Sequence, residues 1–140
     1  MNMKKVIFLL LLFPFLAGCS KPSLEGNITK AEALEKIAEL DKTYYWMERY
    51  VSKSIIAPSQ KIRYDNWTHK ETYIAPAYKS WLICYDGSAY VNGGSHVLVF
   101  VNADTGEYIT DEISATGIHV QWDPEYYYCP PSDVLPPWAK

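Results

Sequence analysis

The stretch that decides the fold is Ser80–Ile113, which reads SWLICYDGSAYVNGGSHVLVFVNADTGEYITDEI. Its β-branched and aromatic residues gather in three segments, namely Ser80–Tyr85, His96–Asn102 and Glu107–Ile113. A glycine-rich loop, Asp86–Ser95, separates the first two segments. Asp104 and Gly106 separate the last two and are typical of a short hairpin turn. The pattern therefore predicts three consecutive antiparallel strands.

A helix is predicted upstream of these strands. Thr29 and Glu32 have the spacing of a capping box. Apolar residues then recur at helical spacing, at Ala31, Leu34, Ile37 and Ala38. The helix is expected to end near Asp41.

The remaining segments give weaker signals. Strand candidates lie at Thr43–Val51, Ser54–Pro58, Lys61–Trp67 and Ile118–Trp122. For Thr43–Val51, a continued helix is the alternative. Thr68–Lys79 contains Pro76 and is expected to be an irregular connection.

One helix followed by antiparallel strands predicts an α+β fold. We expect the N-terminal helix to pack on one face of an antiparallel sheet of about four to five strands. The predicted domain spans 28–122. A tail rich in Pro and Tyr, 123–140, is expected to pack on the domain, because its prolines exclude a central strand.

Length and composition restrict the function classes. The chain has 140 residues, which suits a single domain and excludes a large multidomain enzyme. A hydrophobic fraction of 49% with 21% charged residues excludes a disordered chain. The net charge of −3 provides no basic footprint, so no nucleic-acid partner is expected.

The N-terminus has the pattern of a signal peptide. Lys4 and Lys5 precede the apolar segment Val6–Leu16, whose eleven residues are too few to span a bilayer as a helix. The segment 1–18 is therefore expected to be removed. Loss of the two lysines would change the net charge from −3 to −5.

The end of this segment, Leu16-Ala17-Gly18-Cys19, resembles the lipobox of bacterial lipoproteins. The resemblance implies a diacylglycerol on the Cys19 thiol and a membrane anchor through that lipid. Ser20 follows, with no Asp to indicate inner-membrane retention, so an outer-membrane location is expected. Residues 19–27 would form the lipidated N-terminus and tether. An ordinary secretory signal is the alternative.

Export would place Cys84 and Cys129 in a compartment where disulfides persist. We therefore predict a disulfide between them. The alternative, a nucleophilic Cys84, is disfavoured because the residue lies in the middle of a predicted strand.

Few residue patterns indicate catalytic or metal chemistry. Gly93-Gly94 is followed by a predicted strand and not by a helix, which argues against a phosphate-binding loop. His69, His96 and His119 lack metal-ligand spacing, so no metal and no cofactor are expected. Asp86 and His96 would form a general base pair across the hairpin, or else an Asx turn beside a strand residue. No credible nucleophile accompanies them.

Aromatic residues provide the stronger indication of function. Tyrosine and tryptophan crowd the first half of the domain and the tail, where Tyr126, Tyr127 and Tyr128 are consecutive. Such rings either fill the core or form a recognition face for a polypeptide or a glycan.

Two stretches resemble PepSY-like domains. Ile28–Leu34 (ITKAEAL) is similar to the capped opening of their first helix, and Val99–Ile109 (VFVNADTGEYI) is similar to their closing hairpin. Such modules occur in bacterial lipoproteins and protease propeptides, which implies a small α+β domain that binds or restrains a protein. The Trp81 strand, the Gly93-Gly94 loop and the hairpin also resemble nuclear-transport-factor-like immunity proteins.

We therefore expect a non-enzymatic envelope lipoprotein that binds a polypeptide partner by strand addition or loop insertion, as a protease inhibitor would. The expected partner-binding residues are Tyr126, Tyr127, Tyr128, Asp86 and His96. A glycan or small-ligand binder, or an immunity protein, is the alternative. A ligand binder predicts a concave pocket lined by Trp, whereas a protein partner predicts a flat aromatic patch or a free sheet edge.

Overall fold

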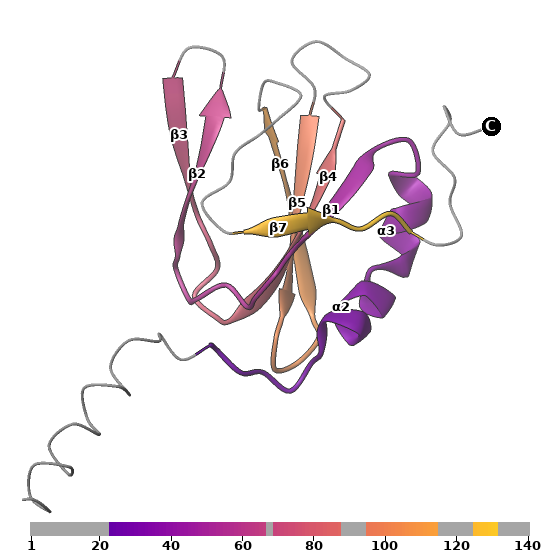
Figure 1. Cartoon of the computed structure of the whole chain (residues 1–140), viewed down its shortest axis with the longest axis vertical. Helices are drawn as coiled ribbons and strands as arrows, with labels where there is room; N and C mark the ends of the chain where they lie inside the picture. The colour runs from indigo at the N-terminus through magenta and orange to yellow at the C-terminus, as the bar shows by residue number, and fades with distance from the viewer. Residues whose placement is uncertain (1–22, 67–68, 88–94, 115–124, 132–140) are drawn as a thin grey trace, which may run out of the picture.

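The computed structural model describes residues 23–66, 69–87, 95–114 and 125–131. These residues form two short helices and seven strands (Figure 1). The helices are α2 (Lys30–Lys36) and α3 (Ala38–Thr43). The strands are β1 (Glu48–Ser52), β2 (Lys61–Asn66), β3 (His69–Ile74), β4 (Ser80–Asp86), β5 (Ser95–Asn102), β6 (Tyr108–Ser114) and β7 (Tyr126–Tyr128).

Five strands form an antiparallel sheet in the order β6-β5-β4-β1-β7. Strand β1 lies between β4 and β7, so that Tyr50 pairs with Cys84 on one side and with Tyr128 on the other. The first and the last described strands are therefore neighbours. Strands β2 and β3 form a separate two-stranded hairpin.

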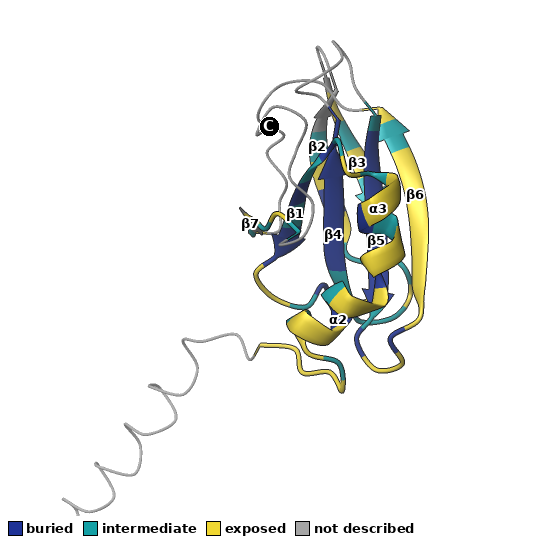
Figure 2. Ribbon diagram, turned by 90° about the vertical axis from the view of Figure 1, so that its right-hand side faces the viewer, coloured by how far each residue is buried: buried dark blue, intermediate teal, exposed yellow. Residues whose placement is uncertain are grey.

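The central strands β4 and β5 are buried on both faces of the sheet, whereas β6 is exposed (Figure 2). On one face, Ala33 and Ile37 from the helical segment share a core with Val97, Val99 and Val101 of β5. On the other face, the β2–β3 hairpin supplies residues to a second core around Leu98 and Phe100. We call these the helix side and the hairpin side of the sheet. Because each central strand contributes side chains to both cores, its sequence is an almost unbroken apolar run.

The turn between β5 and β6 follows from two residues. Gly106 adopts a φ of 78°, a left-handed conformation that L side chains rarely adopt. The Asn102 side chain accepts hydrogen bonds from the backbone N–H groups of Asp104 and Thr105, at 2.9 and 3.1 Å. The Asn102 N–H in turn donates to the Glu107 carbonyl at 2.7 Å, which closes the hairpin.

The predicted α+β fold with one N-terminal helix on a sheet is wrong. The described chain is mostly β, and its helical part consists of two pieces of seven and six residues. The single predicted helix is interrupted at Ile37, whose φ of −100° and ψ of 12° are not helical. The β2–β3 hairpin adds strands on the hairpin side, which shifts the balance further from helix to strand.

Several local predictions are confirmed. The capping box is present, because the Thr29 N–H donates to a Glu32 carboxylate oxygen at 2.7 Å and the Glu32 N–H donates to Thr29 Oγ1 at 3.2 Å. Strands are found where the sequence predicts them at Lys61–Asn66 (β2), Ser80–Asp86 (β4), Ser95–Asn102 (β5) and Tyr108–Ser114 (β6).

Other local predictions differ from the structure. The irregular connection predicted at Thr68–Lys79 contains β3. The strand predicted at Ser54–Pro58 is only an isolated bridge between Ile56 and Ser80, and the strand predicted from Thr43 begins at Glu48. The strand predicted at Ile118–Trp122 lies outside the described residues, as do residues 1–22 with the predicted signal peptide and Cys19. Neither described helix has the length or the apolar run needed to cross a bilayer.

Candidate functional site

Asp86 and His96 are brought together by the pairing of β4 with β5. They are directly opposite one another in the register, and His96 Nε2 lies 2.9 Å from Asp86 Oδ1. Asp86 is 6% exposed and His96 is fully buried. Asp86 is the last residue of β4 and not part of the predicted loop, whereas His96 lies in β5, where a strand was predicted. The pair contributes to the interior of the sheet and offers little surface to a partner.

Two of the three consecutive tyrosines lie on the same side of the sheet as that pair. The Tyr126 and Tyr128 rings contact the Tyr50 ring, with centroid distances of 5.4 and 5.5 Å. Tyr128 is 44% exposed, whereas Tyr126 is half-buried. The Tyr127 backbone pairs with Val51, and its side chain lies outside the described residues. The structure thus assembles an aromatic cluster on the hairpin side, at the β7 edge.

Tyr50 connects this cluster to a carboxylate. Its hydroxyl donates to Glu48 Oε2 at 2.7 Å. Burial raises the pKa of the Tyr50 hydroxyl well above its ordinary value, and the hydrogen bond and negative charge of Glu48 raise it further. The hydroxyl is therefore a hydrogen-bond donor at neutral pH and not a base.

A buried polar network on the helix side was not predicted from the sequence. Arg49 donates from one guanidinium nitrogen to Asp41 Oδ2 at 2.6 Å and from Nε to the Cys129 carbonyl at 2.7 Å. The Tyr85 hydroxyl donates to the other Asp41 oxygen at 2.5 Å. Arg49 is 5% exposed and Asp41 is 9% exposed. The network joins α3, β1, β4 and the residue after β7, and its role is to hold these elements together.

The predicted disulfide is not formed, because Cys84 and Cys129 are both free thiols. Cys84 belongs to the hairpin-side core, whereas Cys129 packs on the helix-side core. Cys84 lies on β4 and Cys129 follows β7, and these strands are separated by β1. Two strand spacings amount to about 10 Å, beyond the reach of a disulfide. Burial raises the pKa of the Cys84 thiol, and the charge of Asp86 adds to this effect, which disfavours the nucleophilic thiolate.

Strand β6 is the longer of the two strands at the edges of the sheet. It has seven residues against three in β7, and among the described strands it pairs with β5 alone. Figure 2 shows it at the side of the sheet, exposed along nearly its whole length and not covered by α2 or α3. Six of its seven side chains are exposed, and only Ile113 is half-buried.

The register defines which backbone groups of β6 are free. Because Asn102 and Glu107 form a hydrogen-bonded pair, the alternation of an antiparallel ladder makes Ile109, Asp111 and Ile113 the residues that bond to β5. The backbone groups of the intervening residues then point away from the sheet, at Tyr108, Thr110 and Glu112. This row of donors and acceptors is a template for a further strand.

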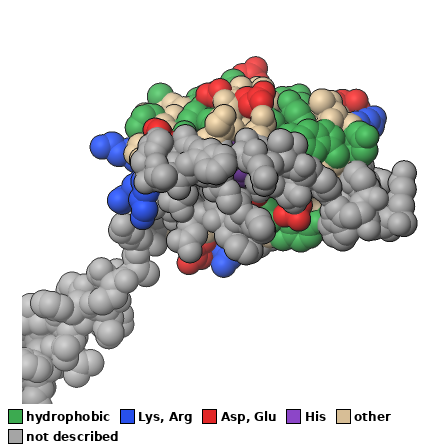
Figure 3. Space-filling view, turned by 90° about the horizontal axis from the view of Figure 1, so that it is seen from above, with side chains coloured by type: hydrophobic (Ala, Val, Ile, Leu, Met, Phe, Trp, Pro, Cys, Tyr) green, Lys and Arg blue, Asp and Glu red, His purple; other side chains and the backbone are tan. Residues whose placement is uncertain are grey.

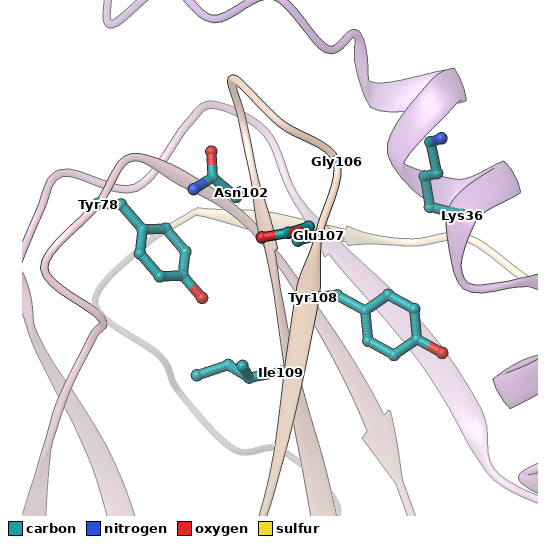
Figure 4. Close-up of a pocket in the computed structure, with 7 residues that line it drawn as sticks. All are labelled: Lys36, Tyr78, Asn102, Gly106, Glu107, Tyr108 and Ile109. Atoms are coloured by element: carbon teal, nitrogen blue, oxygen red, sulfur yellow. The ribbon is translucent and has the colours of Figure 1, made fainter.

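A shallow pocket of about 510 Å³ lies at the start of β6 (Figure 4). Tyr78 and Ile109 line it on one side of the strand, and Tyr108 lies on the other side, toward the helix that carries Lys36. Asn102, Gly106 and Glu107 complete the lining as far as the structure describes it, and none of these described residues is a Trp. The exposed Tyr108 ring therefore links the pocket to the β6 edge.

The surface of the described residues is mixed in character. Seen from above, acidic and hydrophobic side chains lie next to one another (Figure 3). Within the described ranges, no group of three or more His, Cys, Asp or Glu side chains is placed to hold a metal ion.

Comparisons of the chain with protein-family models, with curated proteins and with solved structures found no match.

Proposed function

We propose that the protein is a lipid-anchored binding module of the bacterial envelope, held at the outer membrane by Cys19. In this proposal it carries out no catalytic reaction. It binds a polypeptide partner by accepting an extended segment as an additional strand beside β6. Strand addition supplies affinity through main-chain hydrogen bonds and requires only an exposed edge.

The observation that carries the proposal is the open edge of β6. Tyr108, Thr110 and Glu112 present outward backbone groups there, and the side chains around them are exposed. Tyr108 and Ile109 are 38% and 48% exposed, which provides apolar surface beside the hydrogen-bonding row. A protease is one class of partner worth testing, since proteases bind extended segments and the sequence resembles PepSY-like modules.

The alternative of a glycan or small-ligand binder receives support from the pocket at the start of β6. Its tyrosine rings and the Asn102 and Glu107 side chains suit a polar ligand with apolar faces. However, the pocket is shallow and its described lining residues include no Trp, whereas the edge is seven residues long. The geometry therefore favours strand addition.

The test is a Thr110→Pro variant. The Thr110 N–H points away from β5, so proline removes a donor from the free edge without removing a bond from the sheet. Thr110→Val is the matched control, because it keeps the N–H and the β propensity. Each full-length protein is used to capture partners from an extract of its own envelope, and the retained proteins are compared by mass spectrometry.

A partner retained by the unmodified protein and by Thr110→Val, but lost with Thr110→Pro, would support strand addition. Hydrogen exchange should then show slower exchange at the amides of Tyr108, Thr110 and Glu112 in the complex. Equal retention by Thr110→Pro, or protection confined to other strands, would reject the proposal.

A further inference from the structure

The free edge carries a charge of a single sign. Glu107, Asp111 and Glu112 are all exposed, and β6 contains no Lys or Arg. Among the described residues, lysine and arginine side chains form ion pairs with other carboxylates, such as Asp41, Glu39 and Asp104, and none with these three. Within the part of the chain that the structure describes, no cation therefore neutralises the carboxylates along β6.

The two adjacent acids face opposite sides of the sheet. Asp111 is opposite Leu98 on the hairpin side, where it accepts a hydrogen bond of 2.6 Å from the Tyr73 hydroxyl. Glu112 is opposite Val97 on the helix side. An added strand would therefore face one carboxylate on each of its own two sides, at two consecutive positions.

Apolar positions flank the acid on the hairpin side. Ile109 and Ile113 precede and follow Asp111 in the alternation of the strand. Directly opposite residues of neighbouring strands interact most strongly, through opposite charges or through apolar contact. The side chains of β6 are thus complementary to an added strand that has two adjacent cationic residues and apolar residues on either side of them.

A second copy of this chain is a poor occupant of the same edge. The β6 strand of a second copy carries the same carboxylates and no Lys or Arg. Pairing two β6 strands would therefore neutralise no charge in any register. Charged residues on an edge strand are a known means of preventing self-association between sheets. The acidic side chains of β6 therefore disfavour pairing with β6 of a second copy and favour a partner of opposite charge.

We infer that the segment bound at β6 is an extended basic peptide with two adjacent Lys or Arg residues flanked by apolar residues. The inference rests on the proposed strand addition and specifies the chemistry of the partner.

The test uses three end-capped seven-residue peptides that differ only at two central positions. The sequences are Val-Thr-Lys-Arg-Val-Thr-Ser and its Gln-Gln and Glu-Glu counterparts. Each is titrated at low salt and up to millimolar concentration into the ¹⁵N-labelled full-length protein in a non-ionic detergent. The amide resonances of Tyr108, Thr110 and Glu112 report binding at the edge. Asp111→Lys/Glu112→Lys reverses the charge. Asp111→Asn/Glu112→Gln removes the charge but keeps a side-chain oxygen that can accept the Tyr73 hydrogen bond.

The Lys-Arg peptide should bind about fivefold tighter than the Gln-Gln peptide, because two cross-strand pairs of opposite charge are formed. The preference should pass to the Glu-Glu peptide in the charge-reversed variant, disappear in the neutral variant, and weaken at high salt.

Equal dissociation constants for all three peptides, with shifts at β6, would overturn the basic preference and leave strand addition standing. An absence of shifts at the three amides with every peptide would overturn strand addition itself.

Discussion

Arg49 is the residue on which the helix side of the molecule depends. Its guanidinium group is almost completely buried and binds both the Asp41 carboxylate and the Cys129 carbonyl. A buried charge of this kind is tolerated because its donors have nearby acceptors. The same group therefore fixes α3 against β1 and holds the chain just beyond β7.

Replacing Arg49 by Met should lower the free energy of unfolding by about 3–5 kcal/mol, because the Asp41 carboxylate would remain buried without its cation. Urea unfolding followed by circular dichroism measures the change. Lys42→Met is the matched control, since Lys42 and Glu39 form an exposed pair at 2.9 Å whose loss should cost less than about 1 kcal/mol. Similar losses in the two variants would contradict the importance of the buried network.

Tyr85 should make the stability sensitive to alkaline pH. Burial raises the pKa of its hydroxyl, and the hydrogen bond to Asp41 raises it further. Its contribution is fully present below about pH 10, the ordinary tyrosine value. Above that pH the unfolded chain ionises first, so the contribution is lost as the pH rises toward the folded-state pKa.

Urea midpoints measured between about pH 9 and pH 11 should therefore fall less steeply for Tyr85→Phe than for the unmodified protein. Tyr45→Phe, which alters an exposed ring, serves as the control. Parallel pH dependences for Tyr85→Phe and the unmodified protein would exclude a role of this hydroxyl.

At the scale of elements, local signals predicted part of the fold. Strands β4 and β5 have apolar runs that only strands buried on both faces require, and Gly106 supplies the left-handed residue of the next turn. Strand β3 was missed because it faces the hairpin-side core mainly through Tyr73, so it lacks an apolar run. The helix was overestimated because nothing in the apolar spacing indicates the break at Ile37.

The candidate site was harder to predict than the strands. The sequence predicted β6 as a strand, but its position at the edge depends on the pairing of β1 with β4 and β7, between residues far apart in the chain. Asp86 and His96 were paired correctly across the hairpin. They are buried because the hairpin-side core covers that face of the sheet, and no pattern in the neighbouring sequence predicts this core.

The separation of Cys84 on β4 from Cys129 after β7 leads to a further prediction. In a Cys19→Ser variant, Cys84 and Cys129 should both react with a maleimide after denaturation without reductant, giving two labels by mass spectrometry. In the folded protein Cys84 should stay unlabelled, because it is 5% exposed and burial raises its pKa. Labelling that requires prior reduction would instead demonstrate a disulfide.

At the scale of the whole molecule, the described residues form three layers, with the five-stranded sheet between the helices and the β2–β3 hairpin (Figure 1). This arrangement covers both faces of the central strands and leaves the β6 edge of the sheet open. The Glu25 carbonyl accepts a hydrogen bond from the Lys79 side chain, and Glu25 lies six residues after the proposed lipid site at Cys19. The proposed anchor therefore lies near the module, on a short tether.

The proposed lipid anchor predicts that the protein partitions into the detergent phase of Triton X-114. The mature N-terminal fragment should carry the mass of an acylated Cys19, because more than one acyl chain gives stable anchoring. A Cys19→Ser variant should pass to the aqueous phase. Detergent partitioning that persists in this variant would argue against lipidation at Cys19.

The pairing of β1 with β7 also has a consequence for the order in which the protein is assembled. A chain is made from its N-terminus, so β1 acquires β4 early but waits for Tyr126–Tyr128 to cover its other side. Until then, a row of unsatisfied backbone groups beside Tyr50 is available to any chaperone. Complete pairing of β1 therefore requires β7, whereas the residues that pair in β4 and β5 all precede β7 in the chain.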